Sequence, residues 1–270
     1  MTMSVQDLSF PQSEAAKLEP YLPPVHAQQP ESSLPFVTLT FATSLDSALS
    51  LAPGTRTALS GPQSKAMTHY LRSRHDAICI GVGTAVADDP GLNCRLQGIE
   101  TARQPRPIVI DPMLRWQFTR ESKVLQLARA SCGLAPFIIT ADHAPPQGQK
   151  ALLEEHGGKY IVLGNDDTSP THFKWGQILH AVRAEGLRSI MIEGGGQIIN
   201  SLLEPGSHQL VDSVILTIAP TWLGQGGVVV SPARRLGPSG EPIAAARLTS
   251  IAWIPLGGDV VLCGRLAQQT

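Results

Sequence analysis

The stretch SIMIEGGGQIINSLL, residues 189–203, decides the fold of this chain. Residues 190–192 form an unbroken apolar run, as expected of a strand that is covered on both faces. Glu193 ends that run, and three glycines follow it. The next apolar residues recur at helical spacing and give a helix one core-facing side: Ile198, Ile199, Leu202 and Leu203. The stretch therefore predicts a strand, a glycine turn and a helix, the repeating unit of an α/β protein.

The glycine turn has two interpretations. Residues without side chains can adopt positive φ and let a ligand approach the main chain closely. The following helix points free N–H groups at the turn, which suits a phosphate, and Glu193 lies at a strand exit, where open α/β sheets bind ligands. Many α/β proteins use glycines only to turn tightly, so this stretch alone leaves both open. Its spacing is not the G-x-G-x-x-G of a Rossmann fingerprint.

Composition bounds the possible functions. The chain has 270 residues, 42% apolar and 16% charged, with a net charge of −1. We expect no nucleic-acid partner, because no basic stripe is present, and no membrane span, because no apolar run approaches 20 residues. The four cysteines are isolated from one another, which indicates neither a zinc site nor a disulfide framework. Reduced cysteines and an N-terminal part without arginine before Arg56 favour a cytoplasmic protein with no metal site.

The pattern along the chain predicts a mostly parallel mixed sheet flanked by helices. Strands are expected at residues 36–42, 57–60, 76–82, 106–111, 135–140, 160–163, 190–192 and 211–219. Helices are expected at residues 62–73, with Ser60 as N-cap, 151–156 and 173–186. Residues 248–254 and 259–266 flank a Gly-Gly turn and predict a closing antiparallel hairpin. Residues 1–34 are expected to be an N-terminal extension, partly disordered or with a short helix near 14–21, and residues 35–270 a single domain.

Other strand exits also carry polar groups. Asp46 follows the first strand, and Thr84 and Asp88 follow the strand at 76–82, four residues apart on one side of a helical turn. His69 and His75 are expected at the surface. The sequence lacks the motifs of an α/β-hydrolase, a P-loop and a zinc deaminase. A hydroxyl, carboxylates and a bare backbone turn remain, a set that can bind a dinucleotide and a polar heterocycle without a metal.

Several of these segments together resemble one enzyme family. The matching pieces are residues 35–46, 67–72, 81–84, 87–94, 105–111, 192–196 and 260–263. They are similar to the 2,5-diamino-6-ribosylamino-4(3H)-pyrimidinone 5′-phosphate reductases of riboflavin biosynthesis, in their stand-alone fungal form. That family is kin to the reductase domain of the bacterial bifunctional deaminase-reductase. The resemblance spans roughly residues 35–267.

The resemblance implies a dihydrofolate-reductase-like fold, NADPH as cofactor, a phosphorylated pyrimidine as substrate and a homodimer. The residues it implies for the cofactor are Thr84, Asp88, Phe173, Gly194, Gly195, Gly196, Gln197 and Ile198. Those it implies for the substrate are the catalytic Asp46 and Glu193, with Arg72, Leu92 and Arg95 beside it. A solvated helix residue remains the alternative for Arg72. The family often has glycine where this chain has Ser47, and because serine resists positive φ, the Asp46 loop is expected to bend differently.

The implied reaction is hydride transfer from the nicotinamide to C1′ of the ring-opened ribosylamino group, which gives the ribitylamino product. Asp46 would be nearest the proton transfer, and Glu193 would orient the substrate. No basic residue lies in the glycine turn to explain a preference for NADPH over NADH. Two alternatives remain: an NADPH reductase of the same fold that acts on a pterin or folate, and a nucleotide-binding domain without catalysis.

Overall fold

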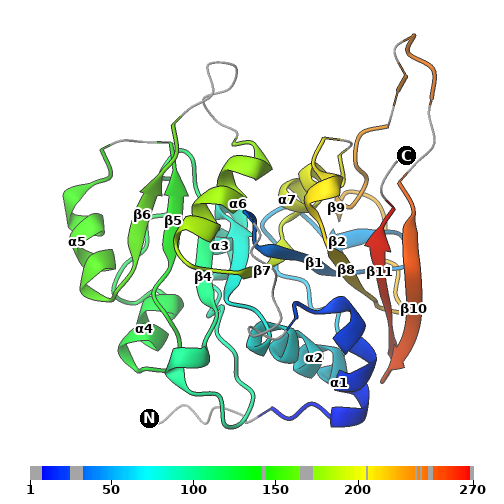
Figure 1. The fold of residues 1–270 in the computed structure, drawn as a ribbon, viewed down its shortest axis with the longest axis horizontal. Coiled ribbons are helices and arrows are strands. Elements are labelled where there is room, and N and C mark those ends of the chain that lie inside the picture. Colours follow the sequence, from blue (N-terminus) through cyan, green and yellow to red (C-terminus); the bar gives the residue numbers. More distant parts are fainter. Residues whose placement is uncertain are drawn as a thin grey trace.

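A nine-stranded mixed sheet forms the centre of the molecule (Figure 1). The computed structural model describes residues 8–24, 33–141, 144–164, 173–204, 206–234, 236–237, 239–242 and 246–267. The strand order is β10-β11-β8-β1-β7-β3-β4-β5-β6. The strands of this sheet are β1 (Phe36–Thr43), β3 (Ala77–Gly81), β4 (Arg106–Ile110), β5 (Phe137–Thr140), β6 (Lys159–Val162), β7 (Ser189–Gly194), β8 (Ser213–Ile218), β10 (Leu248–Leu256) and β11 (Asp259–Leu266).

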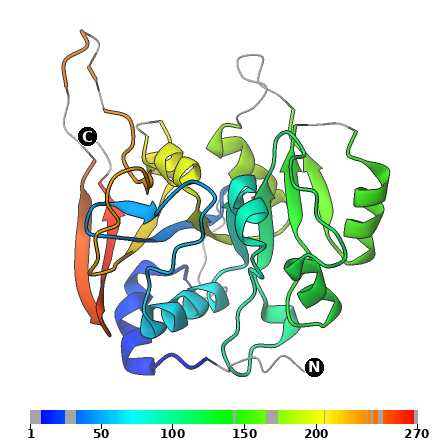
Figure 2. The same ribbon diagram turned by 180° about the vertical axis from the view of Figure 1, so that it is seen from behind.

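The sheet is parallel except at one edge. The seven strands from β8 to β6 pair in parallel, whereas β11 is antiparallel to both β8 and β10. The hairpin β10–β11 forms one side of the molecule, and α5 with β6 lies at the opposite side (Figures 1 and 2). The expected mostly parallel mixed sheet with a C-terminal antiparallel hairpin is therefore confirmed.

Helices cover both faces of the sheet. They are α1 (Gln12–Leu18), α2 (Pro62–Ser73), α3 (Val82–Asp88), α4 (Lys123–Arg129), α5 (Gln147–Glu155), α6 (Trp175–Ala184) and α7 (Gly196–Leu203). The helices α6 and α7 share one large core with the strands, α3, α4 and α5 share a second, and α1 and α2 share a third with the hairpin. In Figure 1, α6 and α7 lie above the central strands, and α1 and α2 lie below them. Within the described residues, no helix is long and apolar enough to cross a membrane.

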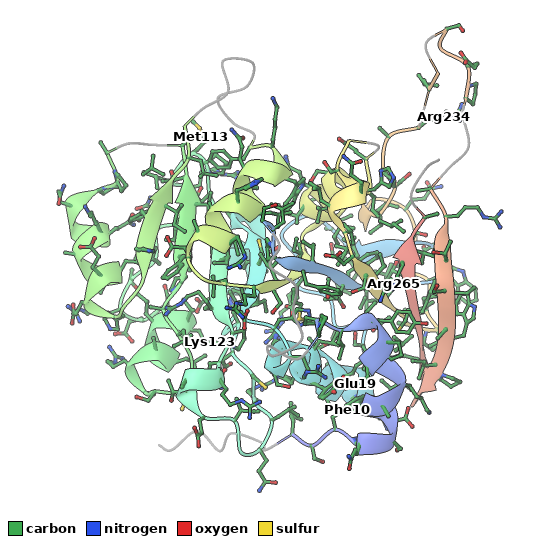
Figure 3. All side chains as sticks on the ribbon, in the orientation of Figure 1. Phe10, Glu19, Met113, Lys123, Arg234 and Arg265 are labelled. Carbon is green, nitrogen blue, oxygen red and sulfur yellow. The ribbon has the colours of Figure 1, made fainter. Side chains whose placement is uncertain are left out.

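The N-terminal residues pack against α2 and the hairpin. The helix expected near residues 14–21 is present as α1 followed by the 3₁₀ helix η1 (Glu19–Tyr21). Leu18 is 1% exposed within the third core. The ring of Phe10, which is labelled in Figure 3, stacks on that of Tyr70 with 5.2 Å between the ring centroids. Residues 1–7 and 25–32 of the expected extension lie outside the described residues. The boundary after residue 34 stays a prediction.

Two local predictions were wrong. Residues 57–60 form no strand; instead β2 (Ala48–Ser50) pairs with β9 (Val228–Val229) in a separate two-stranded sheet. Ser60 is not the N-cap of α2, because Gly61 holds that position. The carboxylate of Asp259 accepts the Gly61 amide at 2.8 Å and the Ser64 hydroxyl at 2.6 Å. The start of α2 is thus fixed from the first residue of β11, which the local sequence does not reveal.

Candidate active site

The strands β1, β7 and β3 are adjacent and parallel, so their carboxyl ends lie side by side. The strand β7 lies between β1 and β3, although it follows both in the chain. Asp46 follows β1, Glu193 is the penultimate residue of β7, and Thr84 follows β3 in the first turn of α3. Sheet topology therefore brings these three predicted groups to one edge, where ligands of open α/β sheets bind.

The glycine turn meets the first turn of α3. Gly194 and Gly195 have φ of 107° and 86°, values that residues with a side chain rarely adopt, and α7 begins at Gly196. The Thr84 hydroxyl lies 3.5 Å from the Gly194 carbonyl oxygen, and a Cβ at Gly195 would come within 3.0 Å of that hydroxyl. The structure thus places Thr84 beside the glycines. Because the first amides of a helix have no intrahelical acceptor, the start of α7 offers N–H donors at this edge.

The other residues predicted to bind the cofactor lie in the first turn of α7, at the end of α3 and just before α6. Gln197 and Ile198 occupy the first turn of α7, and a Cβ at Gly81, the N-cap of α3, would come within 3.0 Å of the Ile198 side chain. Asp88 ends α3 and is half-buried, one helical turn from Thr84. Phe173 precedes α6 and packs, half-buried, against the core that α6 and α7 share. Thr84 lies within hydrogen-bond distance of the glycine turn.

Glu193 and Arg72 form a two-pronged ion pair. Arg72, from the last turn of α2, donates from Nε to Glu193 Oε1 at 2.9 Å and from Nη2 to Oε2 at 2.8 Å. Its third nitrogen, Nη1, donates to the Asn93 carbonyl at 3.0 Å. The side chains of Arg72 and Glu193 are only 14% and 19% exposed. Arg72 is therefore not a solvated helix residue, and much of its guanidinium is used to hold Glu193 and the chain at Asn93.

The segment after α3 is held from several sides. The side chain of Gln104 makes two hydrogen bonds to the backbone of Cys94, of 2.7 and 2.9 Å. The side-chain amide of Asn93 donates to the Cys132 carbonyl at 2.8 Å. Leu92 has a positive φ of 54° and is 3% exposed, with its side chain in the second core. These contacts fix the backbone that carries Arg95. Because the Leu92 side chain is buried, a substrate could contact mainly the Leu92 backbone.

The two histidines of this region are buried, so their expected surface position was wrong. His69 and His75 are each 4% exposed. His75 contacts the Leu71 carbonyl and the Thr38 hydroxyl at 2.7 and 2.8 Å. His69 contacts the backbone N and the guanidinium of Arg95. Burial lowers the pKa of His69 to about 3, and the positive charges of Arg72 and Arg95 add to this effect.

The Asp46 carboxylate is an acceptor for a neighbouring loop. Ser44 donates its hydroxyl to Asp46, and the amides of Leu223 and Gly224 donate at 3.1 and 2.7 Å. These hydrogen bonds, the Ser44 bond first, lower the pKa of Asp46 to about 2. Ser47 adopts a positive φ of 61°, so serine takes the left-handed conformation that a glycine would favour here. The premise that serine would resist positive φ here was wrong, and the expected difference in the bend of the loop stays a prediction.

Sequence reasoning did not predict that the loop of residues 223–231 contacts both Asp46 and α7. After its contacts with Asp46, the chain continues to β9, where Asn200 of α7 donates to the Val229 carbonyl at 3.1 Å and accepts the Ser231 amide at 2.8 Å. A Cβ at Gly196 would lie 2.4 Å from a Val228 methyl carbon. The asparagine four residues after the last glycine was the available clue, but its partners are about thirty residues away in the chain. Within the described residues, no group of acidic, His or Cys side chains could hold a metal ion.

Comparisons with known proteins place this chain among similar sequences and structures. The family model described as "RibD C-terminal domain" matches residues 35–262. A 2,5-diamino-6-ribosylamino-4(3H)-pyrimidinone 5′-phosphate reductase of Debaryomyces hansenii is 39% identical over 92% of this chain and 94% of its own. A protein of the same name from Eremothecium gossypii is 41% identical over 93% and 95%. The solved structure of the Saccharomyces cerevisiae riboflavin biosynthesis reductase Rib7 is 35% identical, with a TM-score of 0.73 over 93% of this chain and 98% of that one.

Proposed function

The chain belongs to the RibD C-terminal domain family, and on that premise we propose that it reduces 2,5-diamino-6-ribosylamino-4(3H)-pyrimidinone 5′-phosphate with NADPH. The product carries a ribitylamino group in place of the ribosylamino group. Relatives that cover nearly all of this chain bear the name of this reductase. The observation that carries the proposal is the meeting, at one sheet edge, of the Thr84–glycine turn and the Glu193–Arg72 pair.

The glycine turn fits a dinucleotide. Side chains are absent where the backbone of Gly194 and Gly195 faces Thr84, and a Cβ at Gly195 would reach that hydroxyl. Gly194, Gly195, Gly196, Gln197 and Ile198 would hold the phosphates at the start of α7, with Thr84, Asp88 and Phe173 beside them. When bound, the nicotinamide supplies the hydride. The preference for NADPH over NADH rests on the family resemblance.

The residues proposed to contact the substrate are charged side chains held in place by hydrogen bonds or by a fixed backbone. Arg72 holds the Glu193 carboxylate by two hydrogen bonds, so Glu193 can orient the substrate without rotating. Arg95 lies on the adjacent fixed segment and can bind the substrate phosphate, which guanidinium groups match well. Asp46 is ionised at neutral pH, because its pKa is about 2. It therefore serves as a hydrogen-bond or proton acceptor near the sugar, and a proton donor must be another group or water.

A homodimer and a cytoplasmic location complete the proposal. The homodimer comes from the family resemblance, and the cytoplasmic location comes from the isolated cysteines. The edge strand β10 supports a dimer, because its large side chains Ile251 and Trp253 are 53% and 57% exposed. Light scattering after size-exclusion chromatography measures the oligomeric state directly, and a monomer at all concentrations would remove the dimer from the proposal.

The test is a turnover assay that follows loss of NADPH absorbance. We expect oxidation with the ribosylamino-pyrimidine phosphate and none with dihydrofolate. Turnover of dihydrofolate alone would replace the proposal with a pterin or folate reductase. NADPH binding without turnover of either compound would favour a nucleotide-binding domain.

The matched variants are Glu193→Gln and Glu155→Gln. Glu155 also forms a two-pronged pair, with Arg120, but both side chains are at least half exposed. Glu193→Gln should retain fold and NADPH binding, lose about 1–3 kcal/mol of stability because a charged hydrogen-bond pair is weakened, and lose most turnover. Glu155→Gln should leave turnover unchanged. Wild-type rates in Glu193→Gln would exclude Glu193 from the mechanism.

A further inference from the structure

The N-terminal arm, residues 8–22, lies outside the residues that the family model matches, yet it contacts the segment that carries Arg95. Leu8 forms a parallel β-bridge with that segment. The Leu8 amide donates to the Arg95 carbonyl at 3.2 Å, and the Gln97 amide donates to the Leu8 carbonyl at 3.1 Å. The backbone on both sides of residue 96 is therefore tied to the arm.

The same arm is anchored on α2. The ring of Phe10 stacks on that of Tyr70 with 5.2 Å between the ring centroids, and Glu19 accepts hydrogen bonds from Tyr70 and Arg74. The helix α2 also carries Arg72, which holds the carboxylate at the end of β7. One segment thus contacts both elements whose arginines are proposed to face the substrate.

The backbone around Arg95 lies between the arm and α2. From α2, Arg72 donates to the Asn93 carbonyl at 3.0 Å, and the His69 carbonyl accepts the Cys94 thiol at 3.1 Å. The Arg95 side chain contacts the same helix, with its Nε 3.1 Å from Nε2 of His69. Burial lowers the pKa of Arg95, and the positive charge of Arg72 lowers it further. Two guanidinium groups are thus kept near each other by elements that the arm holds.

We propose that Leu8 and Phe10 are positioning residues of the reductase: they hold the Arg95 backbone against α2 and so set the Arg95 guanidinium for the phosphorylated substrate. A loosely held segment would have to be ordered at each binding event, and such ordering costs affinity. The Leu8 bridge supplies this order in the folded protein before the substrate binds. The inference rests on the proposed function for the role of Arg95, and it gives the N-terminal arm a part in substrate binding.

The first experiment needs no turnover. Hydrogen exchange of the full-length protein, followed by NMR, reports the protection of the Gln97 amide, which donates to Leu8. We expect this amide to be protected in the wild type and to exchange roughly tenfold faster in Leu8→Pro, which lacks the amide that donates to Arg95. Exchange of Gln97 in the wild type at the rate of an unstructured chain would overturn the inference while leaving the proposed reductase activity intact.

The second experiment separates KM from kcat. Leu8→Pro should raise the KM for the ribosylamino-pyrimidine phosphate roughly tenfold, the equivalent of one hydrogen bond to a charged group. The Kd for NADPH and kcat should stay nearly unchanged. Phe10→Ala should raise KM in the same direction, and Phe10→Tyr, which keeps an aromatic ring for the stack, should keep the wild-type KM. An arm that only stabilises the fold would instead lower the amount of active enzyme, and hence the apparent kcat, with KM unchanged.

The matched control is Ser9→Pro. Ser9 is exposed, and within the described residues its amide donates to no acceptor. The variant therefore introduces the same residue one position along the arm, and it should keep both the protection of Gln97 and the wild-type KM.

An equal rise of KM in Ser9→Pro, or a wild-type KM in Leu8→Pro, contradicts the inference and leaves the reductase activity standing. If Leu8→Pro does not fold, the KM values of Phe10→Ala and Phe10→Tyr decide. Absence of turnover in the wild type would remove the proposed function, and the inference with it.

Discussion

Replacement of Gly194 by alanine tests the geometry of the glycine turn. Gly194 has a φ of 107°, and a Cβ there would lie 2.6 and 2.8 Å from Cδ1 and Cγ1 of Ile199. Ile199 is 1% exposed in the large core, so it has little room to move. The backbone conformation costs an alanine about 1–3 kcal/mol. Overpacking against Ile199 adds about 1–3 kcal/mol. We therefore expect Gly194→Ala to lose about 2–6 kcal/mol of unfolding free energy.

Urea unfolding measures this loss as a shift in midpoint at constant slope. Gly176→Ala is the control, because Gly176 lies inside α6, has no positive φ, and nothing lies within 4 Å of its added Cβ. That variant should gain up to about 1 kcal/mol, the helix propensity difference between the two residues. Gly194→Ala should also bind NADPH more weakly, as followed by fluorescence titration. Wild-type stability with undiminished NADPH binding in Gly194→Ala would refute the reasoning.

Three further predictions concern ionisable side chains that are buried or held by hydrogen bonds: Asp259, His75 and Asp46. Asp259→Ala should lower the stability of the protein by about 1–2 kcal/mol, as for a lost helix cap, and thermal melts measure it. Burial lowers the pKa of His75 from 6.5 to about 4, so the unfolded state binds more protons between these values. The contribution of His75 to stability should therefore be full above pH 6.5 and fall, by on the order of 3 kcal/mol, as the pH drops to 4, and His69, whose pKa is about 3, should add a loss of the same sign; urea unfolding of the wild type and of His75→Asn at both pH values separates the His75 part. The Asp46 carboxyl should titrate near pH 2 in ¹³C NMR, and a midpoint near 4 would contradict its hydrogen bonding to the loop.

The sheet was predictable because its strands are apolar runs. The strands β3, β4, β5 and β7 contribute side chains to a core on each face of the sheet, and such strands appear in the sequence as largely hydrophobic segments. The hairpin was equally visible from its Gly-Gly turn. By contrast, β9 has two residues, too few for any periodicity. The helix α4 has seven residues, and its first amide is held by Asp89, which lies more than thirty residues earlier in the chain.

The candidate site was predictable as a set of strand exits, but its internal contacts were not. Asp46, Thr84 and Glu193 each follow an apolar run, so their edge could be inferred. The pairing of Glu193 with Arg72 joins residues from β7 and α2, and nothing in either segment identifies the other. His69 was misplaced for the same reason. A polar residue is assigned to the surface by its type, whereas its burial depends on Arg95, which arrives from another segment.

The position of β7 also has a consequence for synthesis and folding. The first sheet strand to be made, β1, has both its neighbours, β7 and β8, in the last third of the chain. Until Ser189 has been synthesised, β1 and β3 have no strand between them, and their facing edges are unpaired. Unpaired edges expose a nascent chain to wrong partners, and contacts this distant in sequence form slowly. We therefore expect the centre of the sheet, with the candidate site, to assemble only after β7 has been made, and to depend on chaperones until then.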